Sequence, residues 1–210
     1  MRHSVALQRY LQRHIEPGLP DYHCSSPRWS NALVIPAYQE SADLMQRLAR
    51  LPRGDGKTLV LLVLNRPDWD PDVAVNAALR TAVGELKLAG APAGAPRTRL
   101  LNDHADLYLH DMESLNIQLP AAQGVGLARK SGCDIILKWM SKGAISGVWI
   151  CCTDADASLT GDYFQRLAGI SGAAAAVYPF RHMPGPLLIC DEATAHYELR
   201  LHHYVLGLEY

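Results

Sequence analysis

The sequence predicts an α/β fold with a mostly parallel sheet flanked by helices. Short apolar runs of strand length alternate along the chain with amphipathic runs of helical length. This alternation is the pattern of repeated strand–helix–strand units with right-handed crossovers. The strand candidates are also near-continuous apolar runs, which is typical of parallel strands covered on both faces.

The first part of the chain is expected to form a helix, a strand and a second helix. Residues 4–15 place apolar side chains at helical spacing and are followed by Pro and Gly, which end helices. A polar connector leads to the apolar run 32–35, expected as a strand that stops at Pro36. Residues 41–51 then carry leucines and a methionine on one helical face.

The middle of the chain contains the strongest strand candidate, TLVLLVLN at residues 58–65. Asp70 is expected to cap a helix over residues 71–88, which begins with a proline. The segment AGAPAGAP at 89–96 is too rich in turn residues to be anything but a loop. A weaker strand is expected at 105–109.

The last part of the chain repeats the alternation. Residues 123–141 have a helical pattern, and the apolar run 148–152, VWICC, is expected as a strand covered on both faces. Thr160 is expected to cap a further helix. The run 173–180 is a strand candidate, and residues 197–210 have a helical pattern.

The composition is that of an ordinary globular protein, with 49% hydrophobic and 20% charged residues among 210. This length suits one large α/β domain or two small ones. A net charge of −1 leaves no basic surface of the kind that nucleic-acid-binding proteins carry. No apolar stretch approaches the roughly 18 residues of a membrane span, and the charged N-terminus does not resemble a secretory signal. We therefore expect a soluble cytoplasmic protein.

The five cysteines are odd in number and form no C-x-x-C pair. This spacing indicates neither a disulfide framework nor a zinc ribbon. Buried structural thiols in a reducing compartment are the expected alternative.

Two carboxylates follow directly on the strand expected at 148–152, namely Asp154 and Asp156. Side chains two apart in an extended segment point to the same side, so both are expected to project beyond the strand end. Carboxylate oxygens suit Mg²⁺ or Mn²⁺, whose shell is often completed by substrate phosphates. A solvated loop is the alternative interpretation, because D-x-D also occurs twice within residues 68–72.

Three segments resemble family 2 glycosyltransferases, which have the GT-A fold. LVIPAYQES at 33–41 looks like their first strand and turn, and GVGLARKSGCDIIL at 124–137 looks like the helix that precedes their metal site. WICCTDADASLTGDYF at 149–164 resembles their metal-binding D-x-D with its following helix. The order and spacing of the three segments together are what makes the resemblance specific.

The resemblance covers residues 31–180 and implies a GT-A-like, Rossmann-like nucleotide-binding domain there. Residues 1–30 are then an N-terminal helix with its connector. Residues 181–210 are a helical tail, expected to be the start of an acceptor-binding half.

The implied activity is metal-assisted and inverting transfer of a sugar from a nucleoside-diphosphate donor, of UDP type, to an acceptor hydroxyl. Asp154 and Asp156 would hold Mn²⁺ or Mg²⁺ against the departing diphosphate, and Asp154 would also contact the donor. Arg129 would add a forked charged donor to a phosphate or to the base edge. A solvated helix charge is the simpler interpretation of Arg129.

The resemblance also implies residues that cradle the nucleoside. They are Pro36, Ala37, Tyr38 and Glu40. Tyr38 would line the base, and Glu40 would accept a hydrogen bond from the ribose or base. Asn65 would pair with the base edge at a position where many members have an acid. A core-edge aromatic and an acid near a helix N-terminus are the simpler interpretations of Tyr38 and Glu40.

The general base is not assigned, because the family's base and acceptor motifs lie well downstream of the D-x-D and only 54 residues follow Asp156. We therefore expect the sequence to be an N-terminal portion of a longer enzyme or a member without its acceptor half. The tail offers two carboxylates as candidates for the base and three histidines as candidates for completing the metal shell. They are Asp191, Glu192, His196, His202 and His203.

Two other functions remain open. DADASL at 154–159 resembles the nucleophile motif of haloacid-dehalogenase-type phosphatases, in which the first Asp attacks phosphorus and the second acts as acid and base. A chain without an acceptor half would instead bind a nucleotide sugar without turning it over.

Overall fold

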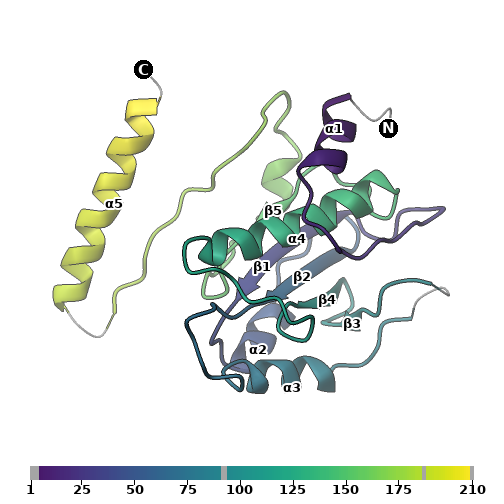
Figure 1. Cartoon of the computed structure of the whole chain (residues 1–210). Helices are drawn as coiled ribbons and strands as arrows, with labels where there is room; N and C mark the ends of the chain where they lie inside the picture. Colours follow the sequence, from purple (N-terminus) through teal and green to yellow (C-terminus); the bar gives the residue numbers. More distant parts are fainter. Residues whose placement is uncertain (1–4, 91–93, 186–187, 209–210) are drawn as a thin grey trace. The chain divides into compact units, whose positions relative to one another are not determined.

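The computed structural model describes residues 5–90, 94–185 and 188–208 (Figure 1). The chain divides into two compact units, Met1–Gly169 and Ile170–Tyr210. The elements follow in the order α1 (Val5–Arg13), β1 (Asn31–Ala37), α2 (Asp43–Ala49), β2 (Thr58–Leu64), α3 (Ala77–Glu85), β3 (Arg99–Leu100), β4 (Ala105–Asp111), α4 (Gly124–Ser141), β5 (Cys151–Cys152), a 3-10 turn (Gln165–Leu167) and α5 (Leu188–Leu208).

The first unit contains a five-stranded sheet in the order β3-β4-β2-β1-β5. The pairs β1–β2, β2–β4 and β1–β5 are parallel, and only the short β3 runs antiparallel to its neighbour β4. Helices flank this sheet, so the predicted α/β fold with a mostly parallel sheet is confirmed. The arrangement is Rossmann-like.

Helix α4 covers one face of β1 and β2 (Figure 1). Gly132 allows this close approach, since a Cβ atom there would lie 2.5 Å from Val34 Cγ1 and 2.8 Å from Val63 Cγ2. Ile35 follows Val34 in the strand and therefore points to the opposite face, where it lies beside Leu44 of α2. The central strands are thus covered on both faces, as their continuous apolar sequences predict.

The connector before β1 contributes to the core on the α4 side. Trp29 is 1% exposed and stacks on Trp139 of α4 with ring centroids 6.0 Å apart, while Tyr22 packs edge-on against both rings. Trp29 Nε1 donates a hydrogen bond of 2.9 Å to the fully buried Asp106 on β4. A segment that composition alone marks as a polar linker is therefore a packed part of the first unit.

Two strand predictions need correction around the edge strand β5. This strand is only two residues long, and Val148, expected within it, is 72% exposed. Because Val148 and Cys152 are exposed, the run 148–152 is not covered on both faces as predicted. Strand β1 does not stop at Pro36 but continues to Ala37. The backbone nitrogen of Pro36 points to the side of β1 on which β5 lies, and β5 ends before it reaches this residue. No N–H donor is needed there, so the strand tolerates the proline.

Three other elements also differ from their predictions. Helix α3 begins at Ala77, because the Asp70 and Asp72 side chains accept hydrogen bonds from the backbone two residues on and hold a turn instead. Only a 3-10 turn follows Thr160 where a helix was expected, and residues 173–180 form no strand. The loop expected at 89–96 falls partly on residues 91–93, which lie outside the described residues.

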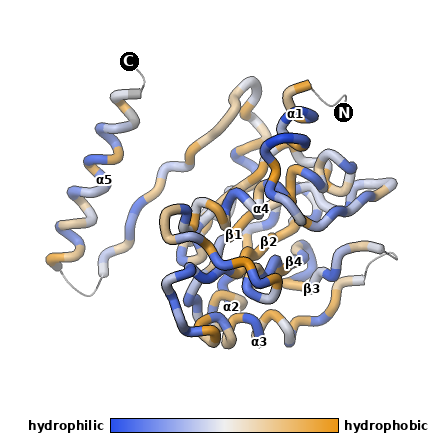
Figure 2. The backbone as a smooth tube through the Cα atoms, in the orientation of Figure 1, coloured by the Kyte–Doolittle hydropathy of each residue, from blue (hydrophilic) through white to orange (hydrophobic). Residues whose placement is uncertain are grey.

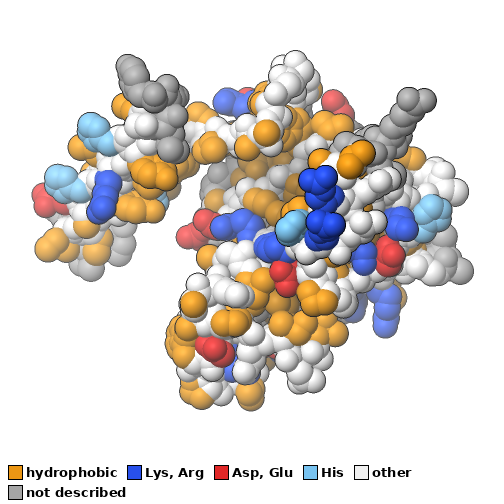
Figure 3. All heavy atoms as spheres, turned by 45° about the horizontal axis from the view of Figure 1, so that its top comes forward, with side chains coloured by type: hydrophobic (Ala, Val, Ile, Leu, Met, Phe, Trp, Pro, Cys, Tyr) orange, Lys and Arg blue, Asp and Glu red, His pale blue; other side chains and the backbone are white. Residues whose placement is uncertain are grey.

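The second unit consists of an extended segment and α5. The helix expected at 197–210 begins earlier, at Leu188, and is described to Leu208. Hydrophobic and hydrophilic residues alternate along its whole length (Figure 2), and hydrophobic and histidine side chains lie on its visible surface (Figure 3). In the described part of the chain, no helix combines the length and apolar character needed to cross a membrane.

Candidate functional site

The candidate site lies where the parallel strands β1, β2, β4 and β5 end. Their carboxyl ends meet at one edge of the sheet, which is where open α/β sheets bind ligands. The turns that follow these strands carry most of the residues singled out by the sequence. The geometry of each turn decides which side chains come together.

Asp154 follows the end of β5 and lies against α4. The strand end is held by a hydrogen bond from the Thr153 N–H to the Val34 carbonyl of β1, 3.1 Å long. Arg129 Nη2 of α4 donates to Asp154 Oδ1 at 2.5 Å, with 37% and 66% of the two side chains exposed. Arg129 and Asp154, predicted as neighbours in one site, therefore form a solvent-accessible ion pair.

Asp156 does not continue the strand. The chain turns after Asp154, whose carbonyl accepts a hydrogen bond of 3.3 Å from the Ala157 N–H, and Ala155 is buried inside this turn. The extended geometry that predicts two carboxylates on one side is therefore wrong for this pair. Asp156 is exposed, and no group of three His, Cys, Asp or Glu side chains suited to a metal ion occurs among the described residues.

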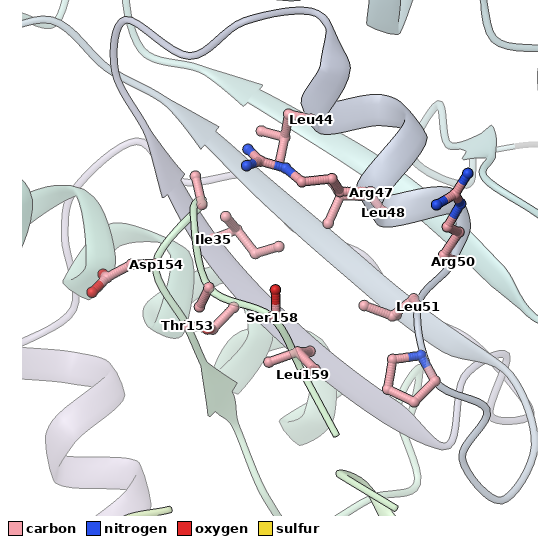
Figure 4. Close-up of a pocket in the computed structure, with 13 residues that line it drawn as sticks. Ile35, Leu44, Arg47, Leu48, Arg50, Leu51, Thr153, Asp154, Ser158 and Leu159 are labelled. Atoms are coloured by element: carbon pink, nitrogen blue, oxygen red, sulfur yellow. The ribbon is translucent and has the colours of Figure 1, made fainter. Parts of the chain in front are cut away.

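A pocket of about 270 Å³ lies between α2 and the segment after β5. Its floor is apolar and its rim is polar; the lining residues are Ile35, Leu44, Arg47, Leu48, Arg50, Leu51, Pro52, Thr153, Asp154, Ala155, Ala157, Ser158 and Leu159. Figure 4 shows the Ser158 hydroxyl pointing into this space and the Asp154 carboxylate pointing away from it. Asp154 thus stands on the boundary between the pocket and Arg129.

Strand β1 ends with the buried Pro36 and Ala37, and Tyr38 is the first residue of the turn that follows. Tyr38 then donates a hydrogen bond of 2.7 Å from its hydroxyl to Asp70 Oδ2, and its ring meets that of Trp69 edge-on. This hydrogen bond raises the pKa of Tyr38 and lowers the pKa of Asp70. Trp69 is 65% exposed, and its place beside Tyr38 was not predicted.

Glu40 and Asn65 make contacts within the protein. Glu40 pairs with Arg47 of α2 at 3.4 Å. Asn65 is buried, and its amide nitrogen donates to the carbonyls of Ala37 at 2.9 Å and Val63 at 3.2 Å. The Asn65 amide therefore ties the ends of β1 and β2 together.

A buried polar network joins three of the strand ends and was missed from the sequence. Asn76 is its centre: the Asn76 amide accepts from the Gln39 N–H, and it donates to the Asn65 carbonyl and to Glu113 Oε2. Glu113 also accepts from Arg66 and Arg80, each at 2.7 Å. The sequence feature that could have predicted this network is the pair of charged segments that follow two expected strands, with Arg66 after 58–65 and Glu113 after 105–109.

The candidates in the tail belong to the second unit. Asp191 Oδ1 accepts a hydrogen bond from the Gly185 N–H at 2.7 Å, and Glu192 is exposed. The three histidines at 196, 202 and 203 are exposed on α5. Their expected roles as base or metal ligands stay predictions.

No protein-family model, no curated protein and no solved structure matches this chain. The function is therefore argued from the geometry of the site and from the sequence motifs.

Proposed function

We propose that the first unit binds a nucleoside-diphosphate sugar, of UDP type, and that the protein is a metal-assisted, inverting glycosyltransferase of GT-A-like fold. One observation carries the proposal. A solvent-accessible carboxylate, Asp154, follows a parallel strand at the ligand-binding edge of the sheet, and it lies between the Arg129 guanidinium and a pocket rimmed by Arg47 and Arg50. Carboxylate and guanidinium side by side suit a metal–diphosphate group.

Asp154 is proposed to hold a divalent cation that takes most of its ligands from the substrate and from water. Mg²⁺ and Mn²⁺ are commonly held by one or two carboxylates together with substrate phosphates. Asp154 would supply one of these carboxylates, and Asp156 is the proposed second although the turn after Asp154 keeps the two side chains from lying side by side in the free protein. Such a cation would stabilise the negative charge on the departing diphosphate.

Arg129 is proposed to change partner when the donor binds. In the free protein its guanidinium neutralises Asp154. A diphosphate offers more oxygens and more charge than one carboxylate, so the guanidinium would turn to it and leave Asp154 for the cation. Both groups would then oppose the charge that develops on the leaving group.

The pocket beside Asp154 is the proposed place for the sugar or the nucleoside. Its lining is mostly apolar, and the Ser158 hydroxyl supplies a hydrogen-bonding group within it. Tyr38 and Glu40 are proposed to line the nucleoside from the turn after β1. The acceptor and the general base are not assigned, and the cytoplasmic location expected from the sequence belongs to the same proposal.

Release of nucleotide from the donor tests the proposal. UDP-sugars and GDP-sugars would be incubated with the protein and Mn²⁺, and free UDP or GDP measured, alongside a generic aryl phosphate. Transfer to water or to an added acceptor by the wild type, lost in Asp154→Asn, would support a glycosyltransferase. Aryl phosphate hydrolysis lost in the same variant would instead identify a phosphatase and overturn the proposal.

A further inference from the structure

Two thiols lie in contact beside the candidate site. Cys133 of α4 and Cys152 of β5 have their sulfur atoms 3.3 Å apart. Both cysteines are free, and Cys152 is exposed while Cys133 is half-buried. The expectation of buried thiols is therefore wrong for this pair, and only Cys151 of the five is buried.

The thiol contact and the Arg129–Asp154 pair join the same two elements. Cys133 lies four residues after Arg129 on α4, and Cys152 lies two residues before Asp154. Four helical residues rise about 6 Å and two strand residues about 6.6 Å, so the two contacts are neighbouring links between α4 and the end of β5. The ion pair and the thiol contact therefore lie beside each other between α4 and the end of β5.

We propose that Cys133 and Cys152 are an oxidation-sensitive pair, which hydrogen peroxide or an organic hydroperoxide converts to a disulfide between α4 and β5. The sulfur atoms need to approach by little more than about 1 Å to reach the roughly 2.05 Å of a disulfide bond. Cys152 is the exposed cysteine, so the oxidant reaches its sulfur first. The Cys133 sulfur lies close enough to attack the oxidised Cys152 and form the disulfide. This inference does not depend on the proposed glycosyltransferase activity.

The chemistry balances with hydrogen peroxide as the oxidant, and an organic hydroperoxide would release an alcohol in place of the first water. The Cys152 sulfur attacks one peroxide oxygen, the O–O bond breaks, and Cys152 becomes a sulfenic acid with release of water. The Cys133 sulfur then attacks the Cys152 sulfur, the S–O bond breaks, and a second water leaves. Two thiols are oxidised to one disulfide, and one peroxide is reduced to two waters.

Strand geometry selects Cys133 rather than Cys151 as the partner of Cys152. Adjacent side chains in a strand point to opposite faces, so Cys151 points away from α4. Cys151 pairs in register with Leu33 and is 7% exposed. It is therefore out of reach of the same oxidant and of Cys133.

Peptide mapping of the full chain after peroxide treatment tests the proposal. Remaining thiols would be alkylated, the protein digested without reductant, and cross-linked peptides identified by mass. We expect one cross-link between the peptides of Cys133 and Cys152, an intact mass lower by two hydrogen atoms, and reversal by dithiothreitol. Closing this loop is expected to raise the melting temperature of the oxidised protein by roughly 6–12 °C.

The matched control is Cys190→Ser, which removes an exposed cysteine of α5. That variant should keep the cross-link and the stabilisation, while Cys133→Ser and Cys152→Ser should each lose both. Because Cys152 is exposed, its serine variant is expected to fold, and its melting temperature without oxidant checks this. Alkylation of Cys133 and Cys152 after oxidation, a cross-link to Cys151, or a disulfide between two chains would overturn the proposal.

Discussion

At the scale of single residues, the carboxylates of the first unit fall into two groups. Asp106, Asp111 and Glu113 are buried or nearly so and are held by Lys or Arg, so they tie different segments of the first unit together. Asp154 also pairs with an arginine, but its side chain stays 66% exposed. Only the second kind can exchange its partner for a ligand without first exposing a buried charge.

The pH dependence of stability should reveal the structural role of Asp111. Burial raises the pKa of Asp111, but hydrogen bonds from Arg80 and Ser114 outweigh it, so the pKa lies below its ordinary value of 3.8. A depressed pKa means that this stabilisation is present above pH 3.8 and is lost as the pH falls through the lower pKa of the folded state. Asp111→Asn should therefore lower the free energy of unfolding by about 1.5–3 kcal/mol at neutral pH and by less in acid.

Urea unfolding would measure the free energy of unfolding of the wild type and of Asp111→Asn. The two proteins would be compared at neutral pH and at the most acidic pH at which both still fold. Asp162→Asn is the control, because Asp162 forms an exposed i,i+4 pair with Arg166. Removing that pair should cost less than about 0.5 kcal/mol. A destabilisation by Asp111→Asn that stays constant with pH would argue against an ionised partner of Arg80.

At the scale of elements, the central strands and α4 were predictable, and the edge of the sheet was not. TLVLLVL of β2 is buried at every position and apolar at all but the first, because both faces and both edges of that strand are covered. VWICC is an apolar run as well, but at the sheet edge only its last two residues pair. Local composition does not encode how many neighbours a strand has, so the length of β5 could not be read from it.

Packing of α4 on the sheet gives a prediction with a control in the same helix. Gly132→Ala places a methyl group within 2.5 Å of Val34 Cγ1 and 2.8 Å of Val63 Cγ2, so overpacking should destabilise the protein by about 1–3 kcal/mol. Gly126 has no atom within 4 Å of an added Cβ. Gly126→Ala should be neutral or stabilise by roughly 0.4–1 kcal/mol.

Chemical or thermal unfolding of the two variants beside the wild type would measure both effects. Equal stability of Gly132→Ala and Gly126→Ala would mean that α4 does not approach β1 and β2 as closely as the structure has it.

At the scale of the whole molecule, the sequence predicted the fold class, and it named Arg129 and Asp154 as candidates for one site without predicting their ion pair. The fold prediction rests on strand–helix alternation, and the prediction for Arg129 rests on the resemblance of residues 124–137 to a glycosyltransferase helix. The buried role of Asn65 was not predictable, since its partners are carbonyls of residues 37 and 63 that only the sheet register brings within reach. The turn after Asp154 was missed because a D-x-D pattern fits an extended segment and a turn equally well.

Calorimetric titration of UDP and GDP into the full chain, with and without Mn²⁺, tests the central claim most directly. We predict that UDP binds only when Mn²⁺ is present. The affinity should fall at least about tenfold, or roughly 1.4 kcal/mol, in Asp154→Asn. It should stay unchanged in the control Asp162→Asn, because Asp162 is also an exposed aspartate that pairs with an arginine. Binding of neither nucleotide by the folded wild type, or equal binding by both variants, would contradict a metal–diphosphate site at Asp154.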